Sequence, residues 1–196
     1  MEKIFQQIWD EALPYQDKRD DKGHAEITTA YTLKLLETEK GDERIILPAI
    51  ILHDIGWSQL PKKMLKRLTD SSAPKAELRL IRLAHQDAGV ALAKKILTTV
   101  KYPKEYISEI LEIISQHDTR QGFISNNEGL VRDADKLWRF SKTGIASDLR
   151  RFKIPFNQLY DKLIDHRIEE PGYFYSTKAK EIAYREIALR KKEYVK

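Results

Sequence analysis

The sequence predicts an all-α protein that folds as one domain. Apolar residues recur with helical spacing along the whole chain, and no segment shows the alternating pattern of a strand. The 196 residues are enough for one well-buried core, and typical domain sizes argue against two. Residues 45–52 are apolar on every side and lead directly into His53 and Asp54. Because lone buried charges are costly, this pair predicts a polar site in the core.

The composition limits the chemistry and the compartment. The chain has no cysteine, so disulfides, thiolate zinc sites and cysteine nucleophiles are excluded. A transition metal would have to be held by histidine and carboxylate. No apolar run approaches the roughly 20 residues that a membrane-spanning helix needs, and the N-terminus lacks the pattern of a secretory signal. We therefore expect a cytoplasmic protein without a membrane partner.

The net charge of +5 is unevenly distributed. Residues 62–82 and 178–196 each carry an excess of lysine and arginine, which is typical of solvated helix faces. Neither patch has interleaved aromatic residues or glycine-rich loops, so binding to a nucleic acid polymer is not expected. The first patch follows His53 and Asp54 closely, and cationic side chains beside a site favour a small anionic substrate.

The first elements are two amphipathic helices. Apolar residues from Ile4 to Trp9 indicate a short helix that ends near Pro14, and residues 16–23 read as a polar loop. A second helix begins near His24, and His24 lies on the same face as Ile27, Tyr31 and Leu35. His24 is therefore expected to point into the core.

The third helix is the apolar one. Residues 41–42 break the chain before it, and Pro48 is tolerable only because it lies in the first half of the helix. The helix is expected to end at His53 and Asp54, with Gly56 as its C-terminal stop. A short basic helix then follows at residues 61–68.

Two more helices carry histidines. A sustained apolar stripe from Leu78 to Ile96 has His85 in its middle, so His85 should face inward. After Pro103, a further helix ends at His117, and the polar residues 118–127 form a loop.

The helix at residues 128–141 contains Asp133 and Asp135. Two residues apart on a helix, these side chains point about 200° away from each other, and the apolar pattern only mildly favours Asp135 as the inward one. Asp133 is expected to cap its own helix. Two final helices, at residues 145–169 and 177–195, are separated by a Pro-Gly pair.

Four of the five histidines fall on, or at the end of, a predicted buried face. A single such histidine would be explained by packing, but several buried together with acids would accumulate desolvation costs with little to offset them. A shared divalent cation removes that difficulty, because imidazole and carboxylate are preferred ligands of such ions. These four histidines are His24, His53, His85 and His117. The fifth, His166, has no partner in the sequence and is assigned to packing or the surface.

The order of these residues resembles the HD-domain superfamily of metal-dependent phosphohydrolases. Residues 49–56 look like its central His-Asp motif, and residues 133–137 look like its closing motif. The resemblance covers about residues 23–140 and leaves the helices at 145–195 unassigned. It implies a single helical bundle, residues 1–196, with a metal site in its core.

The resemblance also implies roles for individual residues. His24, His53, Asp54 and Asp135 would bind one metal, since the second acid of the closing motif is the ligand in the family. His85 and His117 would either bind a second metal, bridged by Asp54, or bind substrate phosphate and orient water. The cofactor would be one or two divalent ions (Fe, Mn, Co, Ni, Zn or Mg).

The implied reaction is hydrolysis of a small phosphate ester, with a nucleotide as the natural choice, by a metal-activated water. Asp54, or a metal-free His85 or His117, would act catalytically on the proton. Arg79 and Arg82, near His85, are the residues expected to bind the substrate phosphate. The motif of cyclic-dinucleotide phosphodiesterases is missing after His117, which argues against that substrate.

Two other functions remain open on the sequence. The same ligand order is similar to that of the di-iron oxygenases of the superfamily, such as myo-inositol oxygenase. A non-catalytic helical module that keeps a metal for stability is the third interpretation. The sequence also leaves a homo-oligomer open.

Overall fold

The computed structural model describes residues 2–19, 21–70 and 72–195, and in these ranges the chain is helical with no strand. The prediction of an all-α protein is confirmed. The α-helices are α1 Lys3–Ala12, α2 His24–Leu36, α3 Glu43–Leu52, α4 Lys62–Arg67, α5 Lys75–Thr99, α6 Lys104–Gln116, α7 Asn126–Leu137, α8 Lys142–Phe152, α9 Phe156–Leu163 and α10 Thr177–Tyr194. Shorter turns are η1 Leu13–Tyr15, η2 Ile55–Gln59, η3 Trp138–Phe140 and the π-helical η4 Ile164–Ile168.

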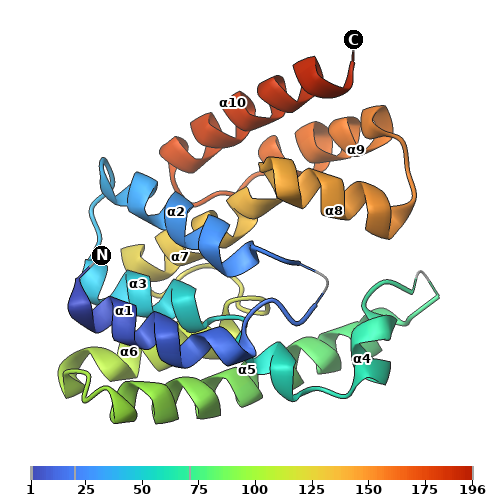
Figure 1. Cartoon of the computed structure of the whole chain (residues 1–196). Helices are drawn as coiled ribbons and strands as arrows, with labels where there is room; N and C mark the ends of the chain where they lie inside the picture. The colour runs from blue at the N-terminus through green and yellow to red at the C-terminus, as the bar shows by residue number, and fades with distance from the viewer. Residues whose placement is uncertain (1, 20, 71, 196) are drawn as a thin grey trace.

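The helices pack around α3, which contacts α1, α2, α6 and α7. The long α5 packs along α6 and over η2, the turn that follows α3. Figure 1 shows α8, α9 and α10 gathered at the top of the view, with α5 and α6 at the bottom and α2, α3 and α7 between them. The last helices contact this arrangement mainly through α7 and η3.

Helix α3 forms the core because every residue from 45 to 52 is buried. Asp42 caps its start by accepting a hydrogen bond from the backbone N–H of Arg44. Pro48 lies inside the helix and has no N–H to donate to the carbonyl of Arg44, four residues earlier. The hydroxyl of Tyr102 donates to that carbonyl instead, at 2.6 Å. This long-range bond explains how a fully buried helix tolerates an internal proline.

Gly56 does not serve as a helix stop, contrary to the sequence-based prediction. It lies within η2, and a Cβ placed on it would come 1.9 Å from the carbonyl oxygen of His85 and 2.5 Å from the backbone N of Gly89. Gly56 is needed because η2 and α5 approach each other too closely for any side chain. This contact fixes the position of His85 against the end of α3.

The prediction of one continuous helix over residues 145–169 is wrong. The structure has α8 and α9 there, separated by Lys153 with a left-handed φ of 52° and by Pro155, which precedes the first residue of α9. Proline disfavours helical backbone in the residue before it, so Ile154 leaves the helical conformation. The apolar pattern continued across the break and hid it.

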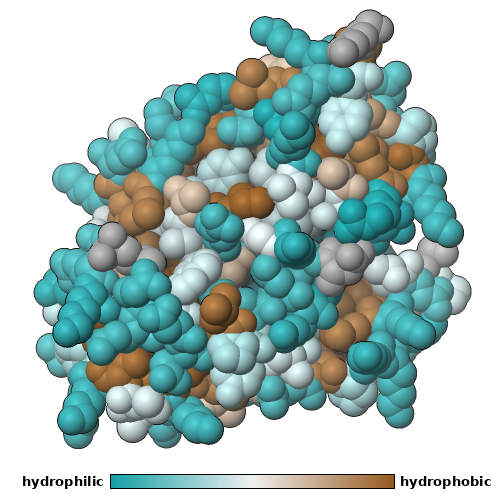
Figure 2. All heavy atoms as spheres, in the orientation of Figure 1, coloured by the Kyte–Doolittle hydropathy of each residue, from teal (hydrophilic) through white to brown (hydrophobic). Residues whose placement is uncertain are grey.

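The surface in Figure 2 is mostly hydrophilic, with hydrophobic residues scattered among charged ones. Within the described ranges, no helix combines the length and the apolar character that crossing a bilayer requires.

Candidate metal centre

Five helices bring one polar side chain or more each to the centre of the bundle. His24 is the first residue of α2, His53 follows α3 directly, and His117 follows α6 directly. His85 comes from the middle of α5 and Asp135 from α7. All four imidazoles are buried, as the sequence predicted. Side chains up to 111 positions apart in the chain therefore meet in one place.

The first group of donors is made by His24, His53 and Asp135. The Nε2 atoms of the two histidines are 3.1 Å apart, and they lie 3.3 Å and 3.5 Å from Oδ1 of Asp135. Oδ2 of Asp54 lies 3.4 Å from Nε2 of His24 and 3.6 Å from Nε2 of His53. Three different helices and the loop after α3 thus direct four donor atoms at one small volume.

The second group uses the other oxygen of Asp54. Its Oδ1 lies 3.4 Å from Nε2 of His117 and 3.6 Å from Nε2 of His85, and these two nitrogens are 3.3 Å apart. Oδ2 of Asp118 is 3.7 Å from Nε2 of His85, so this loop acid borders the group. Asp54 therefore stands between two sets of imidazoles, with one carboxylate oxygen turned to each set.

Hydrogen bonds fix the orientation of two rings. Nδ1 of His53 is 2.7 Å from the carbonyl of Ile50, and Nδ1 of His117 is 2.9 Å from the carbonyl of Ile114. Because a carbonyl can only accept, each Nδ1 must carry a proton. The Nε2 atom of a neutral ring then presents a lone pair to the centre, which is the arrangement that metal-binding histidines need.

The indole of Trp57 contacts two residues of the second donor group. Its ring stacks on His85 at 3.7 Å with an interplanar angle of 8°, and its Nε1–H donates to Oδ1 of Asp54 at 2.9 Å. The indole of Trp138 meets His24 edge-on at 5.1 Å. The Nδ1 atoms of His24 and His85 are buried without a hydrogen-bond partner, so packing against tryptophan orients these two rings.

The pKa values of the central acids and of His53 are shifted by their charged neighbours. Burial alone would raise the pKa of Asp54 and Asp135, but contacts with the imidazoles, and with Arg19 in the case of Asp54, hold both well below their usual range. Burial disfavours the imidazolium of His53, but attraction to Asp54 and Asp135 outweighs it and raises the pKa of His53 to about 9. Positive charge is therefore strongly stabilised at this point, and the convergent donor set fits a divalent cation.

Arg19 is a site residue that the sequence reasoning missed. Its guanidinium lies 3.4 Å from Oδ2 of Asp54 and 3.3 Å from Oδ2 of Asp21, and 4.8 Å from the ring centre of Trp57. It comes from the loop before α2, where no periodic pattern marks which side chain turns inward. The only available signal was that a cation on this loop stands five residues before His24.

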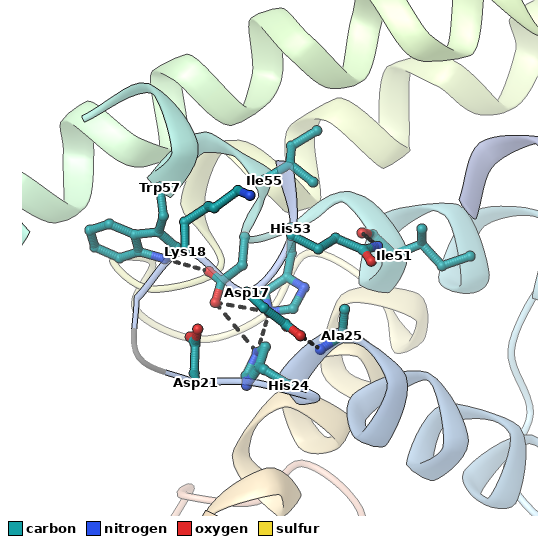
Figure 3. Close-up of a pocket in the computed structure, with 11 residues that line it drawn as sticks. Asp17, Lys18, Asp21, His24, Ala25, Ile51, His53, Ile55 and Trp57 are labelled. Carbon is teal, nitrogen blue, oxygen red and sulfur yellow. Dashed lines mark hydrogen bonds and ion pairs between the residues drawn. The ribbon is translucent and has the colours of Figure 1, made fainter. Parts of the chain in front are cut away.

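Figure 3 shows the part of the metal centre around His24 and His53. The rings of His24 and His53 point toward each other, and Asp21 lies on the same side as Trp57. The cavity bounded by these residues has a volume of about 10 Å³, enough for roughly one water-sized species.

Three other predicted residues lie elsewhere. Arg79 and Arg82 are exposed on α5, and their role in substrate binding stays a prediction. Asp133 does not cap its own helix. It is buried in α7 and accepts hydrogen bonds from the backbone N–H groups of Tyr175 and Ser176, at 2.7 Å and 2.8 Å, just before α10. The reason is geometric, since Asp133 lies two turns into α7 while its carboxylate faces the start of the final helix.

Comparison with family models gives one match, the HD domain, over residues 23–139. The chain belongs to the HD domain family. Searches of the curated proteins and of the solved structures find no match. The HD domain segment contains all five helices that carry the donor residues and ends after Trp138, so α8, α9 and α10 lie outside it. Its histidines and acids form a cluster that could hold a metal ion.

Proposed function

We propose that this HD domain protein is a metal-dependent phosphohydrolase that acts on a small phosphate ester such as a nucleotide. HD domain proteins are generally metal-dependent phosphohydrolases, and the donor set described above suits divalent ions. A bound divalent ion would polarise the phosphoryl group and supply hydroxide near neutral pH.

The observation that carries the proposal is the position of Asp54. Its two oxygens face two separate groups of imidazoles, so Asp54 would be a ligand shared by both groups if each held an ion. His24, His53 and Asp135 would hold one ion, and His85 and His117 the other. Two-metal sites are well suited to in-line displacement at phosphorus, because both the attacking and the leaving oxygen can be stabilised.

The protein's own side chains supply orientation and charge. Trp57 and the carbonyls of Ile50 and Ile114 hold the donor rings in place. Arg19 stands at the edge of the centre, where the positive charge of its guanidinium would stabilise a phosphoryl oxygen. Asp118, beside His85, is placed to accept a proton at its carboxylate.

The test combines metal content with turnover. Protein purified without added metal would be analysed for bound metals and then assayed with a panel of phosphate esters in the presence of Mn²⁺, Fe²⁺, Co²⁺ or Mg²⁺. Asp54→Ala should abolish hydrolysis while the helical circular-dichroism signal persists, and Asp161→Ala, at an exposed position of α9, is the matched control. Turnover by Asp54→Ala would refute the assignment.

The same preparation separates the proposal from an oxygenase. The six donors His24, His53, Asp54, His85, His117 and Asp135 would also suit two irons. Consumption of dioxygen with a polyol or a phosphonate, together with two irons per chain and no ester hydrolysis, would replace the hydrolase assignment by an oxygenase.

A further inference from the structure

A second cavity, of about 280 Å³, lies against α8, α9 and η4. Phe152, Ile154, Leu159 and Leu163 give it an apolar wall. Phe152 is 48% exposed, so part of its side chain is accessible for contact. Figure 2 shows hydrophobic residues at the surface where α9 lies in Figure 1. The volume is slightly below the roughly 300–1,000 Å³ of pockets for drug-sized ligands, so it suits a small organic group.

The remaining wall of the cavity is charged. Arg139, Lys162 and Arg167 contribute three cations, and Asp148 contributes one anion. His166 also lines it. A cavity with an apolar wall and an excess of positive charge favours a ligand that has an apolar body and an anionic group.

Arg139 connects the cavity to the metal centre. It follows Asp135 by four residues and lies in η3, the turn directly after α7. Its guanidinium lies 3.4 Å from Asp148, which is 3.2 Å from Arg151. Trp138, the residue before Arg139, packs edge-on against His24 of the metal centre, with ring centres 5.1 Å apart, while Arg139 itself lines the cavity. The turn η3 therefore lies between the metal centre and the cavity.

The backbone around the cavity is irregular in two places. Lys153, between two lining residues, has a left-handed φ of 52°, and η4 Ile164–Ile168 is a π-helical turn that carries His166 and Arg167. Such conformations are costly for ordinary residues and recur at functional sites. Apart from Arg139, which ends the matched segment, the lining lies outside the HD domain match.

We propose that this cavity binds the apolar, aromatic body of the substrate whose phosphoryl group lies at the metal centre, with Arg139 between the two. An aromatic body is favoured because the exposed ring of Phe152 offers a stacking surface that an aliphatic group would use less well. The inference rests on the proposed phosphohydrolase function and deepens it by naming the substrate class, an aromatic phosphate ester.

The experiment uses one binding probe and two substrates. Anilinonaphthalene sulfonate, an anionic aromatic dye, reports binding through its fluorescence, and naphthyl phosphate should displace it. Hydrolysis of naphthyl phosphate is compared with that of glycerol phosphate, which has no aromatic body. Ile154→Trp fills the cavity, Phe152→Ala removes the exposed ring, and Tyr184→Ala removes an exposed aromatic residue of α10 outside the cavity as the control.

We expect both cavity variants to weaken dye binding and to raise KM for naphthyl phosphate, each by about tenfold, with glycerol phosphate turnover within about twofold of the unmodified protein. The control variant should change neither. Dye binding that both cavity variants retain, or an equal loss on both substrates, would overturn the inference. If neither ester is hydrolysed but naphthyl phosphate displaces the dye only when the cavity is intact, the phosphohydrolase function fails while the aromatic-anion site stands.

Discussion

Metal binding by this protein should depend steeply on pH because a proton occupies the centre when no metal is bound. The pKa of His53 is raised to about 9, so at pH 7 only about 1% of the metal-free molecules have a neutral His53 ring. A metal needs the lone pair of Nε2, which means that this proton must leave. The apparent affinity should therefore rise about tenfold per pH unit below pH 9, or about 100-fold between pH 6.5 and 8.5.

The stability of the metal-free protein should fall as the pH rises, whereas its metal affinity should increase. Since the folded pKa of His53 lies above the ordinary 6.5, its imidazolium stabilises the fold fully below pH 6.5, and this stabilisation is lost as the pH rises through about 9. The shift of roughly 2.5 units corresponds to about 3 kcal/mol of unfolding free energy. Bound metal should abolish this loss, because it replaces the proton.

Two measurements check this. Competition against a chromogenic chelator across the pH range gives the affinity, and calorimetry in two buffers of different ionisation enthalpy gives the protons released. His166→Gln, which changes a histidine outside the centre, should keep the full pH dependence. An affinity that changes less than about threefold over two pH units, or binding without proton release, would refute the reasoning.

Three substitutions test the scaffold. Gly56→Ala places a methyl group against the backbone of His85, so it should cost at least about 2 kcal/mol of unfolding free energy and weaken metal binding. Tyr102→Phe removes the donor to the carbonyl of Arg44 and should cost about 1 kcal/mol. Asp133→Ala leaves two backbone N–H groups at the start of α10 without partners and should cost about 2 kcal/mol, with metal affinity unchanged. Denaturant unfolding measures all three.

Each of these has its own control. The double variant Pro48→Ala with Tyr102→Phe should recover most of the loss, because an alanine at position 48 restores the helical N–H donor; no recovery would contradict that explanation. Gly56→Ala is compared with Ala73→Gly, which lies outside the contact between η2 and α5. A loss of metal affinity in Asp133→Ala would show that the carboxylate serves the centre and not only α10.

Local pattern was enough to predict the helical class and the inward direction of the four histidines. An apolar stripe of period 3.6 defines the buried side of a helix without reference to any other helix. His85 on α5 and His117 at the end of α6 were placed in this way, and both are buried. The same reasoning failed at residues 145–169, because a break between two amphipathic helices need not interrupt the apolar pattern.

The choice between Asp133 and Asp135 needed more than periodicity. Both acids lie on α7, and the burial of Asp133 is nearly complete while Asp135 is partly exposed. A rule that selects the more buried acid would have chosen Asp133, which faces the start of α10 and not the histidines. The structure separates them by their partners: Asp133 meets two backbone N–H groups, whereas Asp135 meets His24 and His53.

What the sequence determined by itself was a set of helices and the face of each that carries an imidazole or an acid. Only the tertiary structure decided that Asp54 turns one oxygen to each pair of histidines and that Arg19, rather than a cation of α5, reaches this carboxylate. The physical reason is that helical periodicity is a property of neighbouring residues. The distance between two side chains on different helices depends on how the helices pack and on loop conformation, which no local pattern encodes.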